Sequence, residues 1–294
     1  MTGKPPVVLK SGKVLDFSGP ALVMAIVNCN DDSFYAPSRA LFDKAVEKAL
    51  AAEEDGASII DFGAESSRPG SSYIAEEEEL RRLVPVIAAF RKQSSLPVSV
   101  DTRKAAVARA VLDAGADIIN DISALTDDPL MAAVCAEYNA AVVLMHKKGV
   151  PLTMQDMLRY EDLPGELSSY LKAASARAIE AGISRGRIIL DPGIGFGKSV
   201  NDNLEILRRL AEICGKDYPV MVGLSRKSFI GEIIGREACQ VAKDAAQQDA
   251  ARGLAGTLAF NGVAITGGAD IIRVHDVKEH VDLAKVLFAL RSGY

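Results

Sequence analysis

The chain contains few cysteines and few histidines, and neither type is spaced for a metal site or a disulfide framework. The four cysteines lie far apart and form no C-x-x-C pair; they are Cys29, Cys135, Cys214 and Cys239. The three histidines include no i, i+4 pair, which excludes a transition-metal site built from protein ligands alone. We therefore expect four reduced thiols and no structural zinc ion.

The sequence also lacks long apolar runs and an excess of positive charge. No apolar run approaches the roughly 20 residues that cross a bilayer, and residues 1–6 lack the apolar core of a signal peptide. With 34 Lys and Arg against 39 Asp and Glu, the net charge of -5 differs from that of proteins that bind nucleic-acid backbones. These features predict a cytoplasmic protein with no nucleic-acid partner and no membrane partner.

The sequence does contain a regular alternation of short apolar runs and longer stretches with helical spacing of apolar residues. In a chain of 294 residues of which 49% are hydrophobic, this pattern is typical of a globular α/β protein. We predict eight strands, at Leu22–Asn28, Ser58–Phe62, Val98–Asp101, Asp117–Asn120, Ala141–Met145, Ile188–Asp191, Val220–Gly223 and Asp270–Val274. We predict eight helices, at Arg39–Asp55, Ala75–Arg91, Lys104–Ala114, Pro129–Tyr138, Leu163–Ala181, Asn201–Cys214, Lys243–Asn261 and Val277–Leu290.

Most of the predicted strands are apolar on both faces, which is expected of a parallel sheet covered by helices. Three helix-to-strand joints contain a glycine that can end a helix, at Gly56, Gly115 and Gly267–Gly268. Eight strand–helix units favour a closed (β/α)8 TIM barrel over an open doubly wound sheet. We assign residues 1–294 to a single domain, in which residues 1–20 are an extension with a short hairpin over Val7–Phe17.

Cationic residues follow the strands of the predicted barrel at the end where active sites of such barrels lie. Arg273 and His275 end the last strand, and Arg68 follows the second. Closure of the barrel brings these groups to one rim, where they form an anion site suited to phosphate or pyrophosphate. Asn28 adds an amide donor or a carbonyl oxygen for a phosphate-bound magnesium ion. Taken singly, each arginine fits a surface ion pair equally well.

Asp101, Asn120 and Asp191 end three further strands, which we expect to alternate round the barrel. Their side chains then reach a central cavity. Together they offer donors and acceptors for a flat heterocycle that carries amino, ring N–H and carbonyl groups. The alternative for each aspartate alone is a cap on the following helix.

The glycine-rich run Asp191–Ser199 matches neither phosphate-loop motif in register, so it does not support a nucleotide-binding fold. Its glycines let the backbone pass close to a ligand, and we expect Phe196 to face the mouth of the site. Lys227 and Ser228 begin a predicted short helix whose free amides favour a carboxylate. Capping of that helix by Ser225 or Ser228 is compatible with this role.

Eight segments of the chain carry a resemblance to a known family. They are Asn28–Phe34, Glu65–Gly70, Ser99–Thr102, Asn120–Ile122, Met145–His146 with Thr153–Gln155, Asp191–Lys198, Ser225–Ser228 and Arg273–Asp276. In this order they are highly specific, and the chain from about Leu22 to its C-terminus resembles dihydropteroate synthase, a folate-pathway enzyme inhibited by sulfonamides.

The resemblance implies a fold, a reaction and partners. The fold is a (β/α)8 barrel, often a homodimer. The reaction is that of a transferase, which joins 6-hydroxymethyl-7,8-dihydropterin pyrophosphate to p-aminobenzoate and gives 7,8-dihydropteroate and pyrophosphate. The implied cofactor is Mg2+.

The resemblance also implies roles for residues at matching positions. Those that would hold the pterin are Asp101, Asn120 and Asp191, with Met145 and Lys227 beside the ring. Those that would hold the pyrophosphate are Asn28, Arg68, Arg273 and His275, with Asn28 as the magnesium ligand. Those that would form the aminobenzoate pocket are Phe34, Ser67, Pro69, Phe196 and Ser228. The catalytic residues implied are Asn28, Asp101, Asp191, Lys227, Arg273 and His275.

The first loop departs from the family's usual Asn-Val-Thr-Pro-Asp-Ser-Phe run. Here residues 28–34 read Asn-Cys-Asn-Asp-Asp-Ser-Phe, and Ala36 stands where the family has an acid. We therefore predict that Asp31 or Asp32 helps to organise magnesium pyrophosphate when this loop closes, with Asp32, which matches the family's own Asp, as the first choice. The alternative is that both aspartates only solvate the loop.

Two other functions fit parts of the pattern. One is a pterin-binding methyltransferase that acts with a corrinoid partner, and the run Ser66–Gly70 together with Lys227, Arg273 and His275 argues against it. The other is a catalytically inactive pterin-binding module, since the first loop is altered. Release of pyrophosphate separates that module from an active enzyme.

Overall fold

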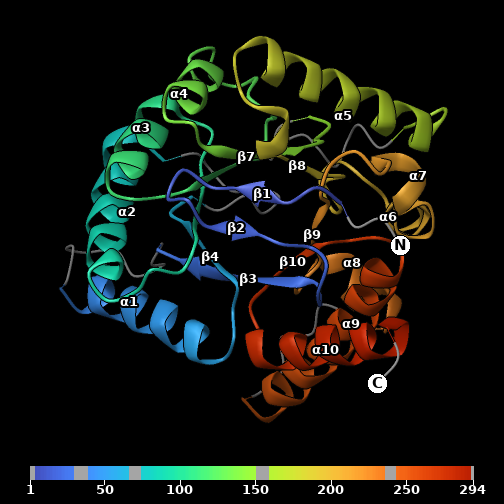
Figure 1. Ribbon diagram of the computed structural model, residues 1–294. Coiled ribbons are helices and arrows are strands. Elements are labelled where there is room, and N and C mark those ends of the chain that lie inside the picture. Colours follow the sequence, from blue (N-terminus) through green and yellow to red (C-terminus); the bar gives the residue numbers. More distant parts are fainter. Residues whose placement is uncertain (1–3, 30–38, 66–73, 150–158, 236–242, 293–294) are drawn as a thin grey trace.

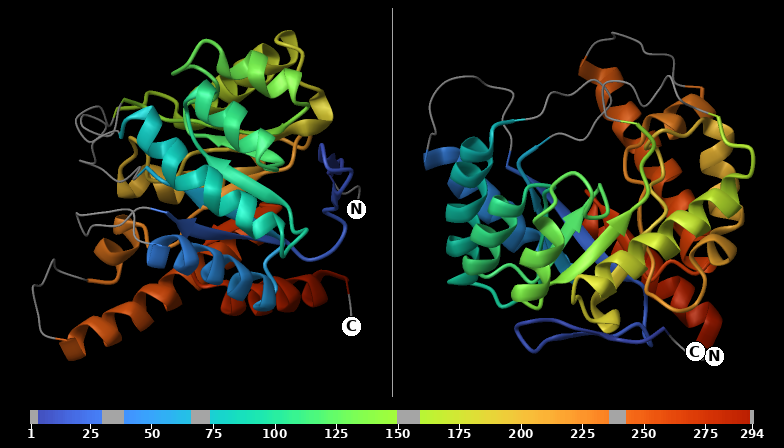
Figure 2. Two further views of the ribbon diagram at one scale, coloured as in Figure 1. Left: turned by 90° about the vertical axis from the view of Figure 1, so that its left-hand side faces the viewer. Right: turned by 90° about the horizontal axis from the view of Figure 1, so that it is seen from above.

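The computed structural model of the protein describes residues 4–29, 39–65, 74–149, 159–235 and 243–292. Eight parallel strands form a barrel, and helices surround it (Figure 1, Figure 2). These strands are β3 (Leu22–Asn28), β4 (Ile59–Gly63), β5 (Val98–Asp101), β6 (Ile118–Asp121), β7 (Ala141–Met145), β8 (Ile188–Asp191), β9 (Met221–Gly223) and β10 (Ile271–Val274). They pair in the order β8-β7-β6-β5-β4-β3-β10-β9. A parallel bridge between Leu190 of β8 and Val220, just before β9, closes the sheet into a barrel. The predicted (β/α)8 barrel is confirmed.

The helices alternate with the strands along the chain. They are α1 (Arg39–Glu54), α2 (Glu76–Arg91), α3 (Ala105–Asp113), α4 (Met131–Glu137), α5 (Leu163–Glu180), α6 (Val200–Arg208), α7 (Leu210–Cys214), α8 (Ser228–Ile233), α9 (Lys243–Thr266) and α10 (Val277–Ser292), with a 3-10 turn η1 at Arg185–Arg187. The strand predictions agree with the structure to within one residue at each end, and most helix predictions to within two. In the described ranges, no helix is long and apolar enough to cross a membrane.

Two helix predictions were wrong in their extent. The predicted helix Asn201–Cys214 is two helices, because Arg209 leaves the helical conformation at φ -115° and ψ 23°. Buried apolar residues continue with helical spacing on both sides of this break, so the spacing does not reveal it. Helix α9 continues past Asn261 and ends at Thr266. Two residues later, Gly268 has a φ of +103°, the left-handed conformation predicted for this joint and also found at Gly56 and Gly115.

Side chains inside the barrel form two layers, because every second residue of a strand points inward. The lower layer, near the amino ends of the strands, is apolar. It contains Met24, Ile59, Ile118, Val143, Ile189, Met221 and Ile271, all exposed by 1% or less. The upper layer, near the carboxyl ends of the strands, contains the polar side chains of the barrel interior, namely Asp61, Asp101, Asn120, Asp191 and Arg273, beside the apolar Ile26 and Met145. The outward-facing strand residues pack against the helices in the main hydrophobic core.

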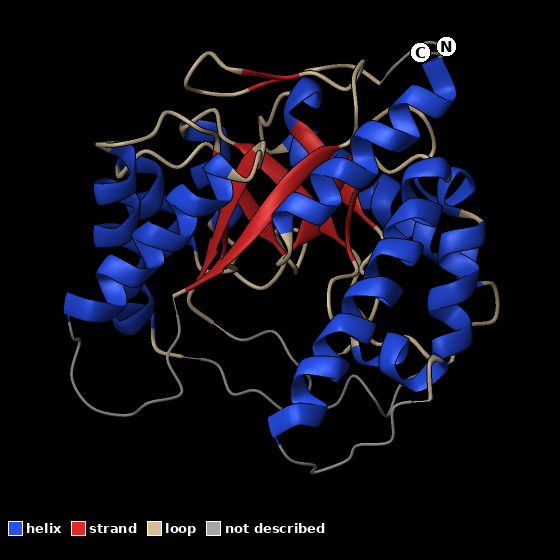
Figure 3. Ribbon diagram, turned by 90° about the horizontal axis from the view of Figure 1, so that it is seen from below, coloured by secondary structure: helices blue, strands red, loops and turns tan. Residues whose placement is uncertain are grey.

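A short hairpin covers the amino end of the barrel (Figure 3). Its strands β1 (Val7–Val8) and β2 (Val14–Leu15) pair antiparallel, as the sequence predicted. Val7, Leu9 and Leu15 pack onto the lower layer and are 1–3% exposed. Burial of each such side chain contributes about 1.5–3 kcal/mol to folding. The hairpin thus completes the lower half of the barrel core and leaves the upper layer at the other end.

Candidate functional site

The polar upper layer contains the side chains predicted to hold a heterocycle. Asp101 is the last residue of β5 and lies opposite Asn120 of β6 in the register of the sheet. Asp191 is the last residue of β8 and is 5% exposed. The expectation that the three strands alternate round the barrel was wrong for β5 and β6, because these two strands are hydrogen-bonded neighbours. Asp101 and Asn120 therefore form one polar edge, and Asp191 lies beyond β7.

The alternative role for the two aspartates, capping of the next helix, is not found. Helix α3 follows Lys104 and has no side-chain cap, although the N–H of Ala105 donates to Asp128. Helix α6 is capped by Ser199. Neither Asp101 nor Asp191 is used to begin a helix, so their carboxylates are available to the interior of the barrel.

Arg273 connects two carboxylates inside the barrel. Its Nε donates to Asp61 Oδ2 at 2.6 Å, and its Nη2 donates to Asp101 Oδ2 at 3.0 Å. Asp61 is fully buried on β4, and its Oδ1 has no hydrogen-bond partner among the described residues. Asp61 is not among the residues predicted from the sequence. The signal that identifies it is a charged residue two positions after the inward-facing Ile59.

Burial and neighbouring charges shift the pKa values of this group. Burial raises the pKa of Asp101; the guanidinium of Arg273 opposes the shift, and the carboxylate of Asp61 adds to it. Burial also raises the pKa of Asp191, against the hydrogen bond from the Gly193 N–H. Burial disfavours the charge on Arg273, but its two carboxylate partners more than offset this effect, so the pKa of Arg273 is raised.

Lys227 and Phe196 form an adjoining side of the site. The Lys227 ammonium lies over the Phe196 ring, 4.1 Å from its centroid. Burial lowers the pKa of Lys227 to about 8, and the carboxylate of Asp191 opposes this shift. Phe196 packs with Met145 and Ile122, and its ring, expected at the mouth of the site, is 9% exposed. An apolar wall suited to a flat aromatic ring thus adjoins the acidic group.

The glycine-rich loop between β8 and α6 comes very close to the chain that follows β7. Gly193 has a φ of +68°, which glycine adopts without strain. A Cβ at this position would lie 1.8 Å from the carbonyl oxygen of His146, so a larger residue does not fit. The Gly193 N–H donates to Asp191 Oδ1 at 2.7 Å. The loop therefore fixes one oxygen of a predicted site residue.

Two further predicted site residues are His275, just after β10, and Ser228, after β9. His275 Nδ1 is 2.9 Å from Ser225 Oγ, and the backbone N–H of His275 donates to the same oxygen at 3.3 Å. Ser225 therefore orients His275. Helix α8 begins at Ser228, whose side chain is exposed, and the helix has no side-chain cap. The capping alternative for Ser225 and Ser228 is thus not found.

Asn28, the predicted magnesium ligand, ends β3 with an exposed side chain. Among the described residues, no group of three or more His, Cys, Asp or Glu side chains could hold a metal ion. Magnesium often takes only one or two protein oxygen atoms and completes its shell with phosphate oxygens and water. The amide oxygen of Asn28 fits an ion that arrives with a phosphorylated ligand.

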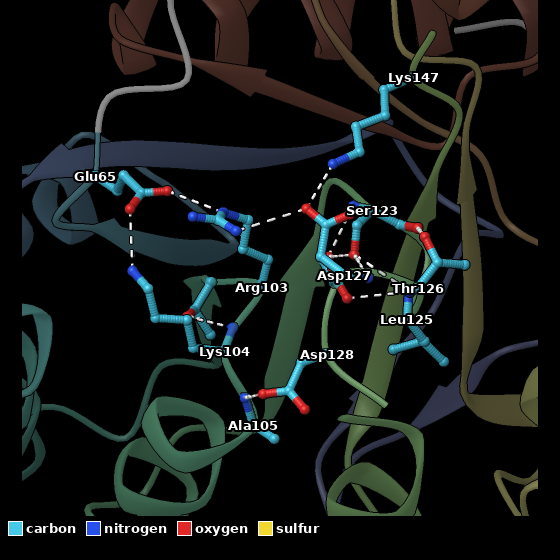
Figure 4. Close-up of polar contacts among 12 residues, drawn as sticks. Glu65, Arg103, Lys104, Ala105, Ser123, Leu125, Thr126, Asp127, Asp128 and Lys147 are labelled. Carbon is cyan, nitrogen blue, oxygen red and sulfur yellow. Dashed lines mark hydrogen bonds and ion pairs between the residues drawn. The ribbon is translucent and has the colours of Figure 1, made fainter. Parts of the chain in front are cut away.

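Ion pairs connect the loops that follow four neighbouring strands at this end of the barrel (Figure 4). Glu65, after β4, pairs with Arg103 at 3.1 Å and with Lys104 at 3.0 Å. Asp127, after β6, pairs with Lys147 at 2.6 Å and with Arg103 at 3.7 Å. These five residues, which we call the rim network, link the loops after β4, β5, β6 and β7.

Some predictions concern residues outside the described ranges. They are the roles given to Asp31, Asp32, Phe34, Ser67, Arg68 and Pro69, and the state of Cys239. Of the four cysteines predicted to be reduced, the three in the described part of the chain are free thiols.

Comparison with known proteins shows what the chain is similar to. A family described as pterin binding enzyme matches residues 24–275. The dihydropteroate synthase of Synechocystis sp. is 40% identical over 287 residues, which cover 97% of this chain and 96% of that relative.

Two solved structures share the fold over nearly the whole chain. Dihydropteroate synthase of Xanthomonas albilineans with 4-aminobenzoic acid has a TM-score of 0.87 at 38% identity and covers 99% of this chain and 100% of its own. A structure from the same organism in complex with 7,8-dihydropteroate has a TM-score of 0.83 at 36% identity, with the same coverage. The similarity thus includes every part of the barrel that carries the site.

Proposed function

This chain belongs to the dihydropteroate synthase family, and we propose that it joins 6-hydroxymethyl-7,8-dihydropterin pyrophosphate to p-aminobenzoate with release of pyrophosphate. The observation that carries this proposal is the grouping of Asp101, Asn120 and Asp191 at one end of the barrel. The methyltransferase alternative has less support, because the relatives described above are dihydropteroate synthases along nearly their full length.

We assign the pterin to the polar upper layer. A reduced pterin presents amino and ring N–H donors and a carbonyl acceptor, and these match two carboxylates, an amide and the Lys227 ammonium. The unpartnered Oδ1 of Asp61 is one more acceptor, either for the ring or for a buried water molecule. Met145 supplies apolar contact to the ring face.

We assign the pyrophosphate to Asn28, Arg68, Arg273 and His275, as the family resemblance implies. Arg273 and His275 are two residues apart at the end of β10, and Ser225 orients the histidine. Magnesium bound with the pyrophosphate would neutralise part of the charge of the leaving group, with Asn28 as its protein ligand.

The p-aminobenzoate is assigned to Phe34, Ser67, Pro69, Phe196 and Ser228. The described part of this pocket is the Phe196 ring beneath Lys227 and the start of α8 at Ser228. In this assignment the aromatic ring packs against Phe196, and its carboxylate binds the hydroxyl and free amides at this helix start. This arrangement supports the assignment of the second substrate.

The reaction proceeds by dissociative substitution. The bond between the pterin methylene carbon and the pyrophosphate oxygen breaks first, and the pyrophosphate leaves with the electron pair. Asp101 and Asp191 stabilise the positive charge that spreads into the pterin, an electrostatic contribution of roughly several kcal/mol. The amine nitrogen of p-aminobenzoate then bonds to the methylene carbon and loses its proton to solvent. No strong general base is required.

We expect the protein to release pyrophosphate only when both substrates and magnesium are present, because the leaving group carries a high negative charge. A coupled assay for pyrophosphate measures this directly, with each component omitted in turn. Excess chelator is expected to stop turnover, and added magnesium to restore it. Full activity in chelator would contradict the metal assignment, and no pyrophosphate under any condition would favour the inactive pterin-binding module.

Asp61→Asn is expected to shift the acid side of the pH profile to lower pH. Asp61 raises the pKa of Asp101 through its negative charge, so removal of that charge lowers the pKa of Asp101. Since ionised Asp101 binds the pterin, kcat/KM falls as the pH drops through this pKa. The measurement is kcat/KM for the pterin substrate against pH, with Asp127→Asn in the rim network as a control that should not move the profile. An acid limb that stays in place in Asp61→Asn would show that Asp101 does not set it.

We further propose that the protein is a cytoplasmic homodimer, as its composition and the family resemblance imply. Exposed apolar side chains on α9 and α10 support a face that a second copy covers. These side chains are Val263, Val286 and Leu290. Light scattering of the purified protein measures the number of copies.

A further inference from the structure

Lys198 is a buried lysine to which the proposed reaction gives no role. It lies at the end of the glycine-rich loop between β8 and α6 and is 6% exposed. Its Nζ donates to the carbonyl oxygen of Gly193 at 2.8 Å and to that of Phe196 at 3.1 Å. The third contact is with His146, whose Nδ1 lies at 3.0 Å and whose carbonyl oxygen lies at 3.4 Å. Every N–H of the ammonium form therefore has an acceptor. Burial lowers the pKa of Lys198 to about 7, and the carboxylate of Asp191 opposes this shift.

His146 is suited to accept this hydrogen bond because its ring is neutral. Burial and the charge of Lys198 lower the pKa of His146 to about 3. A neutral ring that accepts at Nδ1 carries its proton on Nε2. The ring also packs edge-on against Tyr170, with 4.8 Å between centroids, so its position is fixed. Lys198 is thus held from the β7 side by a rigid acceptor.

Other groups hold the outer side of the same loop. The hydroxyl of Tyr160 donates to the Gly197 carbonyl at 2.9 Å. The N–H of Gly195 donates to Asn203 Oδ1 at 2.8 Å. These contacts do not involve the backbone oxygen of Phe196, which is bonded by Lys198. The ammonium group therefore holds the inner turn of the loop, where the aromatic ring of the site begins.

The position of this turn affects the substrate side of the site through Phe196 and Lys227. The Lys227 ammonium lies over the Phe196 ring, and a Cβ placed on Gly195 would come within 3.1 Å of the Lys227 side chain. The glycine-rich loop, the Phe196 ring and the Lys227 side chain are therefore in close contact. We propose that Lys198 is a positioning residue that fixes Phe196 beneath Lys227 and so sets the affinity for p-aminobenzoate, an inference that rests on the proposed function.

Lys198→Met tests this role because it keeps most of the unbranched side chain and removes the ammonium group. We expect the KM for p-aminobenzoate to rise by about tenfold or more. The KM for the pterin substrate should rise by clearly less, since Lys198 is only one of three cations that act on Asp191, beside Lys227 and Arg273. Lys198→Arg keeps the charge, but its planar fork does not match three acceptors around one nitrogen, so we expect an intermediate rise. Calorimetry with 6-hydroxymethylpterin should show that the pterin half of the site is intact. Should Lys198→Met be isolated unfolded, the two KM values of Lys198→Gln decide the question.

Lys147→Met is the matched control. Lys147 is also largely buried at this end of the barrel, but it pairs with Asp127 in the rim network. The KM values of Lys147→Met for p-aminobenzoate and for the pterin substrate should both stay within about twofold of wild type. An unchanged KM for p-aminobenzoate in Lys198→Met, or equal increases in both KM values, would overturn the proposal. A wild-type protein that releases no pyrophosphate would instead refute the proposed function.

Discussion

Arg273→Met is expected to destabilise the fold strongly and to remove measurable turnover. The substitution leaves Asp61 and Asp101 as buried carboxylates without the cation that they share. Breaking a buried ion pair by removing one partner costs about 3–5 kcal/mol of the free energy of unfolding. Denaturant unfolding monitored by circular dichroism measures this loss.

Arg273→Lys separates the charge of this residue from its geometry. A lysine keeps the cation but lacks the planar fork that reaches both carboxylates. We expect the free energy of unfolding to stay much closer to wild type than in Arg273→Met, while kcat/KM falls by about 100-fold or more. Arg226→Met is the control, because the exposed Arg226 forms an ion pair with Asp276 at the same end of the barrel and should contribute under about 1 kcal/mol. A stable and active Arg273→Met would show that the two carboxylates do not depend on it.

Asp101→Asn and Asp191→Asn are each expected to weaken pterin binding by about 100-fold. The amide replaces an acceptor oxygen by a donor that faces the ring N–H groups, and it removes the charge that attracts the ring. Calorimetry with 6-hydroxymethylpterin measures the affinity without turnover. A parallel loss in both variants is expected because the two carboxylates lie in one polar layer.

Asp270→Asn is the control for these two variants. Asp270 is a partly buried carboxylate at the amino end of β10, where it pairs with Lys4 at 3.1 Å and accepts from the Val220 N–H at 2.7 Å. Its substitution should lower stability and leave pterin affinity unchanged, since it lies at the opposite end of the barrel. Unchanged affinity in Asp101→Asn and Asp191→Asn would place the pterin elsewhere.

The residues found from the sequence are those that end an apolar run. Asp101 and Asp191 are visible in this way, because strand ends are marked by a change from apolar to polar residues. Asp61 is inside a strand, and its partner Arg273 is 212 positions away, so their contact follows only from the register of the barrel. The contacts of Lys198 could not be predicted from the sequence either, because the carbonyl groups that it binds belong to a loop whose shape depends on positive φ angles. Local patterns thus locate the ends of strands, whereas contacts across the barrel require the closed sheet.

The hairpin at the amino end of the barrel has a consequence for how this protein can evolve. With that end completed by Val7, Leu9 and Leu15, the apolar contacts of the barrel interior are concentrated at one inward position of most strands. The pressure to recognise a ligand acts on the next inward position, about 7 Å away along the same strand. Ile59 and Asp61 are such a pair, and a change at the second leaves the apolar contacts of the first in place. Natural selection can therefore alter ligand recognition in this barrel without rebuilding its core.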